Sequence, residues 1–168
     1  MPKITTIVNI SRPPAFVREK FLDFSSIPKY KPTFLLGIES LDKKQSSDLR
    51  PGDGVKFTAT MKGKVNIFEA KVASNSPEEF SWQGGLPLGL LKGVHTFHFE
   101  SIDNGNGTKF IQEEVFSGPL SFIMGEGFLA RLFGVKAETE AGYMGFNIDF
   151  RKWVENTEMP LTQKDWRL

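Results

Sequence analysis

The spacing of apolar residues changes once along this chain, and that change constrains the fold more than any other feature of the sequence. Between residues 55 and 117, apolar side chains alternate with polar ones, as at Phe57, Ala59 and Met61. Such alternation is typical of antiparallel strands with one buried face. From residue 120 to residue 155, apolar side chains are instead spaced by four, which indicates a helix. The sequence therefore predicts a sheet followed by a long C-terminal helix.

Turn and breaker residues divide the chain into shorter elements. Pro13 and Pro14 end a first strand and suit the entry to a helix, and Pro32 ends a second short helix. The polar run 42–54 predicts a long surface loop, and the run 103–107 predicts a hairpin because Asn and Gly adopt positive φ. The predicted strands are 4–10, 36–41, 55–61, 64–74, 79–84, 92–102 and 108–117, and the predicted short helices are 15–24 and 25–30.

Length and composition favour one domain over residues 1–168, with a core at about 4–155 and a short tail. Lys and Arg number 21 against 20 Asp and Glu, so the net charge gives no reason to expect a nucleic-acid partner. Residues 1–10 lack the apolar core of a secretory signal, and no stretch approaches the ~20 apolar residues of a membrane span. We therefore expect a cytoplasmic protein and predict nothing about its oligomeric state.

The 16 Phe residues, against 2 Tyr and 3 Trp, leave two interpretations open. Large flat side chains suit the wall of a cavity, but they equally dominate the burial in packed cores. Gly134, Gly142 and Gly145 interrupt the predicted C-terminal helix. A glycine on the buried face of that helix would leave room beside the sheet, which would favour a cavity.

Three segments resemble motifs of one protein superfamily and occur in its order. They are FSSIPKYKP at 24–32, WQGGLPLGLLKGVHTFHF at 82–99, and QEEVFSGPL at 112–120. Together they resemble the START and Bet v 1-like superfamily, also called SRPBCC, over roughly residues 4–155. Ile27 and Tyr30 stand where Trp is common in that group, and the loop 42–54 departs from its pattern.

The resemblance implies an α+β helix-grip fold. In that fold a curved antiparallel sheet of about seven strands wraps around a long C-terminal helix, and two short helices follow the first strand. The resemblance also implies an internal pocket for a small hydrophobic or aromatic molecule. It does not imply one reaction, because the superfamily includes lipid carriers, hormone receptors, and polyketide cyclases and aromatases. A Phe-rich interaction domain without a cavity is the remaining alternative.

The alternation of each strand and the resemblance together give a predicted pocket wall. Trp82 is expected either to line the pocket or to pack in the core. In the last strand we place Glu114 inward because of the resemblance, although Ile111, Glu113 and Val115 form a competing face. The predicted wall residues are Phe57, Ala59, Phe68, Phe80, Trp82, His95, Phe97, Glu114, Phe116, Phe128, Leu132 and Met144.

His95 and Glu114 are the candidate catalytic residues if the protein is a polyketide cyclase or dehydratase. An imidazole and a carboxylate that meet in an apolar cavity can transfer protons. The same contact can instead be a hydrogen bond that only satisfies two buried polar groups. Both interpretations remain open from the sequence.

Other kinds of site find little support in the sequence. His95 and His98 are three residues apart on a strand and so face opposite sides, which argues against a metal site. Nucleotide-binding and serine-hydrolase motifs are absent from the sequence, and we expect no cofactor. The apolar residues of the segment 122–133 are expected to pack on the sheet or gate the cavity rather than contact a membrane.

Overall fold

The computed structural model describes residues 1–127 and 134–159. One seven-stranded antiparallel sheet, in the order β1-β7-β6-β5-β4-β3-β2, forms the body of the molecule. Each strand pairs with its sequence neighbour except β1, which pairs with β7 and so lies at the edge opposite β2. The strands are β1 Lys3–Ile10, β2 Leu35–Ser40, β3 Gly54–Met61, β4 Lys64–Asn75, β5 Glu79–Gly85, β6 Lys92–Ile102 and β7 Gly107–Ser117.

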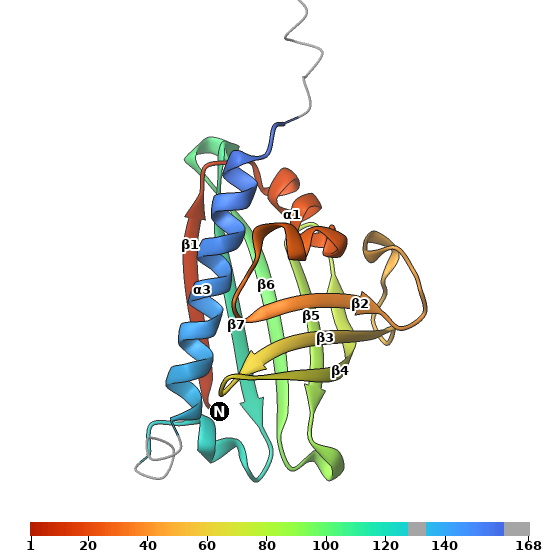
Figure 1. Ribbon diagram of the computed structural model, residues 1–168, viewed down its shortest axis with the longest axis vertical. Coiled ribbons are helices and arrows are strands. Elements are labelled where there is room, and N and C mark those ends of the chain that lie inside the picture. Colours follow the sequence, from red (N-terminus) through yellow and green to blue (C-terminus); the bar gives the residue numbers. More distant parts are fainter. Residues whose placement is uncertain (128–133, 160–168) are drawn as a thin grey trace, which may run out of the picture.

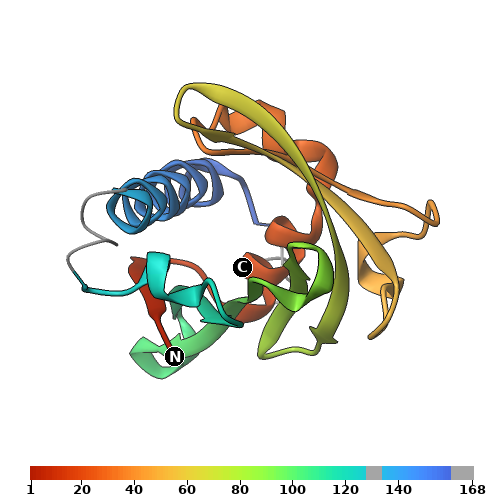
Figure 2. The same ribbon diagram turned by 90° about the horizontal axis from the view of Figure 1, so that it is seen from below.

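The sheet curls, and the long helix α3 (Val135–Asn156) runs along β1 on the inner side of the curve (Figures 1 and 2). After β1 come the short helix α1 (Pro14–Leu22) and the 3-10 helix η1 (Phe24–Tyr30). This arrangement confirms the predicted helix-grip α+β fold.

The C-terminal helix begins later than the spacing of apolar residues predicts. Ser121–Met124 forms the 3-10 helix η5, and residues 128–133 lie outside the described part of the chain. Gly134 precedes α3 with φ of 63°, a left-handed conformation that glycine adopts without steric cost. The sequence predicts helix from residue 120 with an irregularity near Gly125 and Gly127. The start at residue 120 is wrong, since spacing by four cannot distinguish a 3-10 turn from the start of an α-helix.

One end of the curled sheet is filled by phenylalanine rings. Phe21 of α1 lies 4.4 Å from Phe97 of β6 and 5.9 Å from Phe150 of α3, measured between ring centroids. All three rings are buried, and each buried ring contributes about 1.5–3 kcal/mol to folding. Many of the phenylalanine residues therefore form a packed core rather than the wall of a cavity. The other buried phenylalanine rings of this cluster are Phe16, Phe80, Phe99, Phe110 and Phe146.

The glycines of α3 do not simply leave space beside the sheet. The ring of Phe34, which precedes β2, packs directly on Gly142, so that a Cβ atom at this position would overlap it. At Gly145 the nearest atom to an added Cβ would be Thr33 Oγ1 at 3.7 Å, which is an ordinary contact. Gly142 therefore lets the helix and the edge of the sheet approach closely.

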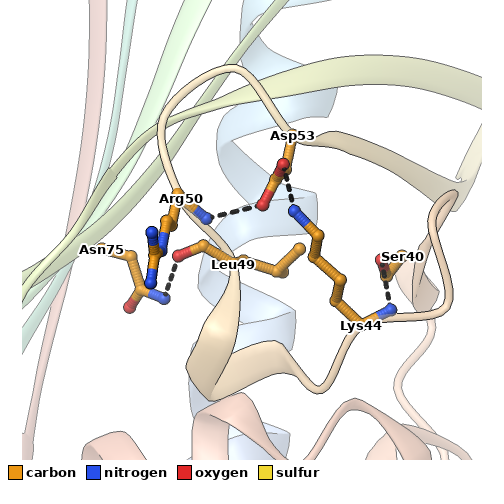
Figure 3. Close-up of polar contacts among 6 residues, drawn as sticks. All are labelled: Ser40, Lys44, Leu49, Arg50, Asp53 and Asn75. Atoms are coloured by element: carbon orange, nitrogen blue, oxygen red, sulfur yellow. Dashed lines mark hydrogen bonds and ion pairs between the residues drawn. The ribbon is translucent and has the colours of Figure 1, made fainter.

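The long loop between β2 and β3 is held by a set of polar contacts (Figure 3). The Asp53 carboxylate accepts hydrogen bonds from Lys44 Nζ (2.6 Å) and from the backbone N–H of Arg50 (2.8 Å), and these lower the pKa of Asp53. Asn75 of β4 donates to the backbone carbonyl of Leu49 (2.9 Å), whose side chain is buried. The sequence predicts this loop, but not that Leu49 anchors it to the core.

The two glycines of α3 give a matched test of this packing. Replacing Gly142 with Ala should lower the free energy of unfolding by about 1–3 kcal/mol, because the new methyl group displaces the Phe34 ring. Replacing Gly145 with Ala should raise it by up to about 1 kcal/mol, since alanine favours helix and its methyl group makes only an ordinary contact. Urea unfolding of both variants measures the difference, and a stabilising Gly142→Ala substitution would contradict the close approach.

Candidate ligand-binding cavity

A cavity of about 580 Å³ lies between the sheet and the first half of α3, next to the phenylalanine cluster. Side chains of β3 to β7, of η5 and of α3 form a largely apolar wall. Ile67, Phe68 and Leu86 belong to the wall and are also exposed, so the cavity reaches the molecular surface beside them. Its volume falls within the range of about 300–1,000 Å³ that is typical of small-molecule sites.

A row of stacked rings runs along the sheet side of this cavity. Phe68 stacks on Phe57 (5.1 Å between centroids), Phe57 on Trp82 (5.2 Å), and Trp82 lies against His95 (5.0 Å), with angles of 22–30° between planes. His95 in turn stacks on Phe97 of the core at 4.6 Å. The imidazole is therefore held between two aromatic rings.

Four polar side chains meet at the inner end of the cavity. The Tyr143 hydroxyl of α3 donates a hydrogen bond to Glu114 Oε2. His95 Nδ1 lies 3.6 Å from the same oxygen, too long for a direct hydrogen bond but close enough for an ion pair with a protonated imidazole. On the other side of the ring, Gln112 Nε2 lies 2.9 Å from His95 Nε2. The four side chains form one chain of contacts from β7 across β6 to α3.

The Gln112 contact orients the imidazole of His95. With the amide nitrogen of Gln112 donating, His95 Nε2 accepts, so a neutral ring carries its proton on Nδ1, facing Glu114. Gln112 is fully buried, and its Oε1 atom has no hydrogen-bond partner among the described residues. The polar groups of this cluster are therefore only partly satisfied by the protein itself.

The last strand presents Glu114, and not Glu113, to the interior. Gln112 and Phe116 share the face of Glu114 and also line the cavity. Glu113 points to the other side of the sheet, where its carboxylate contacts Lys3 Nζ at 2.8 Å. The structure thus settles the choice between the two faces that the sequence leaves open.

Most of the predicted wall residues lie in the wall of the cavity. Those on β3 to β6 lie on the faces that the alternation of apolar residues indicates, and the two on β7 lie on the face that the family resemblance indicates. These residues are Phe57, Ala59, Phe68, Trp82, His95, Glu114 and Phe116.

Three predicted residues are placed elsewhere. Phe80 and Phe97 face inward but are fully buried in the phenylalanine cluster, because they lie nearer the packed end of their strands. Met144 lies beside the cavity residue Tyr143 on α3 but packs against the core. Phe128 and Leu132, also predicted for the wall, lie outside the described residues.

Tyr143 and Phe34 are wall residues that are missing from the predicted set. A signal for Tyr143 is present in the sequence, since it precedes the buried Phe146 by three residues and so shares its face of the helix. Phe34 gives no such signal, because it lies outside any periodic segment and is placed in the wall by its contacts with Gly142 and Tyr143 of α3.

Two further properties of the described residues bear on the kind of site. They contain no group of three or more His, Cys, Asp or Glu side chains that could hold a metal ion. In residues 1–127 and 134–159, no helix is long and apolar enough to cross a membrane.

Comparison with known proteins places the chain in a broad family. Residues 1–142 match the family described as polyketide cyclase/dehydrase and lipid transport. No curated protein matches the sequence closely enough to count as a relative.

Many solved structures share the fold. The Zhui aromatase/cyclase of Streptomyces sp. R1128 is 13% identical, with a TM-score of 0.66, over 91% of this chain and 93% of its own. Major latex-like protein 151 of Panax ginseng is 12% identical, with a TM-score of 0.62, over 94% of this chain and 97% of its own. The protein TTHA0849 of Thermus thermophilus is 16% identical, with a TM-score of 0.63, over 91% of this chain and 97% of its own. At these identities the likeness shows a common fold.

Both tyrosines of the chain, Tyr30 and Tyr143, should resist ionisation in the folded protein. Burial, together with the charge and the hydrogen bond of Glu114, raises the pKa of Tyr143 well above its usual value. Burial, together with the charge of Asp23, also raises the pKa of Tyr30. The stability that these neutral phenols contribute is complete below the unfolded pKa of about 10 and falls as the pH rises beyond it.

An alkaline titration followed by the ultraviolet absorbance of phenolate tests this prediction. The native protein should show little phenolate near pH 10, whereas the protein in concentrated urea should titrate at about that pH. Tyr30→Phe and Tyr143→Phe variants assign the signal to single residues. A native Tyr143 that ionises like the unfolded chain would contradict its burial against Glu114.

Proposed function

Because the chain belongs to the polyketide cyclase/dehydrase and lipid transport family of the SRPBCC superfamily, we propose that it binds a small apolar molecule between its sheet and α3. The observation that carries this proposal is the cavity of about 580 Å³, which has an aromatic wall and a polar cluster at its inner end. An apolar pocket with a few convergent polar groups is the usual form of a small-molecule site.

The position of the cavity supports its interpretation as a binding site rather than as a defect in the packing of the core. Its outer wall includes exposed apolar side chains such as Phe68 and Leu86, so a ligand has an apolar path from solvent. Its inner wall is built on the rigid pairing of β5, β6 and β7, which continue into the packed core. A wall supported in this way keeps its shape when the cavity is empty.

A bulky residue inside the cavity should block binding. Met61 lies in the wall near the end of β3, and Met61→Trp should reduce the affinity for the neutral fluorescent dye N-phenyl-α-naphthylamine by at least about 10-fold. Val65 lies across the same hairpin but is exposed and outside the wall, so Val65→Trp is the matched control and should bind normally.

Dye fluorescence measures both affinities, and mass spectrometry of organic extracts identifies any compound that copurifies with the protein. If Met61→Trp and Val65→Trp bind the dye equally well, or the unmodified protein does not bind it at all, the cavity is not the binding site.

A second function, dehydration or cyclisation of a polyketide-like substrate, is favoured by the contact between His95 and Glu114 in the cavity wall. In a dehydration, the Glu114 carboxylate would accept the proton from the carbon beside a carbonyl. A protonated His95, with the Gln112 amide turned so that its Oε1 accepts from Nε2–H, would donate its Nδ1 proton to the departing hydroxyl, which leaves as water. Proton transfer from Glu114 to His95 across their contact would then restore both groups.

This second function predicts that His95 is needed for catalysis and His98 is not. The test substrate is the aldol adduct of acetone and benzaldehyde, whose dehydration gives a strongly absorbing enone. His95→Gln should lower the rate by about 10²–10⁴-fold. His98 faces the other side of β6, near Glu79, so His98→Gln should leave the rate unchanged. An unmodified protein that is no faster than buffer, while it still binds the dye, argues for binding without catalysis.

A further inference from the structure

The two oxygens of the Glu114 carboxylate have different surroundings. Oε2 accepts the hydrogen bond of Tyr143 and faces His95. Oε1 receives no hydrogen bond from any residue in the described ranges, and it lies over Gly93 of the neighbouring strand β6. A Cβ atom at Gly93 would overlap Oε1, so the absent side chain creates the place where this oxygen sits. Glu114 and Gly93 both belong to the cavity wall.

We propose that the cavity selects a planar aromatic molecule carrying a hydrogen-bond donor, such as a phenolic hydroxyl or an amino group, and that this donor binds Glu114 Oε1. Gly93 is the positioning residue that keeps the carboxylate in place. This inference rests on the proposed binding function, and it specifies the chemistry of the ligand.

The preference for a planar aromatic molecule comes from the stacked rings of the wall. Phe57, Trp82 and His95 stand nearly parallel, with centroids 5.0–5.2 Å apart. Rings stacked in this way turn their faces to one another and leave their edges toward the cavity. Ring edges carry partial positive charge and attract the negative face of an aromatic system. A flat aromatic ligand therefore gains edge-to-face contacts that an aliphatic chain cannot make.

The preference for a donor comes from charge. An ionised carboxylate can only accept hydrogen bonds, and Tyr143 already supplies one donor to Oε2. Glu69, which supplies the second carboxylate of the described wall, is exposed to solvent. An anionic ligand such as a carboxylate would therefore be repelled mainly by Glu114, whose side chain is only 16% exposed. A hydroxyl or amino group instead makes a charge-assisted hydrogen bond.

Three two-ring aromatic probes test the preference for a donor at neutral pH. β-Naphthol carries a donor, naphthalene carries none, and β-naphthoate is an anion of similar shape. Competition against bound N-phenyl-α-naphthylamine measures their affinities for the same cavity. β-Naphthol should bind about 10- to 100-fold more tightly than either of the others, which is the usual effect of one hydrogen bond to a charged group.

Two variants test the roles of the named residues. Glu114→Gln removes the charge at nearly constant shape, so the preference of β-naphthol over β-naphthoate should fall at least about 10-fold. Gly93→Ala keeps the charge but displaces Oε1, so it should lower the affinity for β-naphthol and leave that for naphthalene almost unchanged. Gly37→Ala is the control, because Gly37 of β2 lies outside the cavity wall and an added methyl group there meets no atom within 4 Å.

The outcomes distinguish this inference from the proposed function. If the unmodified protein binds the dye and β-naphthoate or naphthalene displaces it as well as β-naphthol does, the donor site is wrong and the binding function stands. If neither the dye nor any probe binds, the proposed function itself fails. If Gly93→Ala does not fold, Glu114→Gln alone decides: an unchanged selectivity overturns the inference.

Discussion

The packing of the Phe21 ring against rings from the sheet and from α3 is the contact on which the rest of the structure depends. It brings α1 onto the inner side of the sheet, where Phe21 contacts Phe97 of β6 and Phe150 of α3. These buried rings fix the distance between the helix and one end of the sheet. At the other end the sheet and α3 keep the same separation, but α1 does not fill the space between them. This space is the cavity. The packed core and the cavity therefore occupy opposite ends of the same space between the sheet and α3.

The polar cluster lies at the boundary between these two ends, and it takes its geometry from the packed one. His95 stacks on Phe97, a core residue, and its Nε2 atom is held by the buried Gln112. Tyr143 is buried on α3, one turn before the core residue Phe146. The donors and acceptors around Glu114 are therefore in place before any ligand arrives, and a ligand that uses them does not have to order them.

Each sequence pattern predicts one structural property and leaves others undetermined, and this limits how much of the fold and of the cavity could be predicted from the sequence. Alternation specifies a face, which is why it places His95 beside the residues of the cavity wall. It does not specify whether an inward-facing side chain lies at the packed end or at the open end of the space between the sheet and α3. It therefore assigns Phe97 to the cavity, although this ring lies in the core. Spacing by four predicts the buried face of α3 but not its start at Val135, which follows a left-handed glycine. The contact between Phe34 and Gly142 joins segments that share no local pattern, and only the folded chain shows it.

The cluster also depends on a turn far from it. Trp82 pairs with His95, and His95 pairs with Glu114, so the three side chains stand in one row across β5, β6 and β7. The register of β6 and β7 is set by the hairpin loop after Ile102, whose residues Asp103 and Asn104 both have positive φ. That loop lies roughly 25 Å from His95 along an extended strand. A shift of one residue there would turn Glu113 into the interior and Glu114 out to solvent. The chemistry of the cavity is therefore encoded as much in this distant turn as in the residues that line the wall.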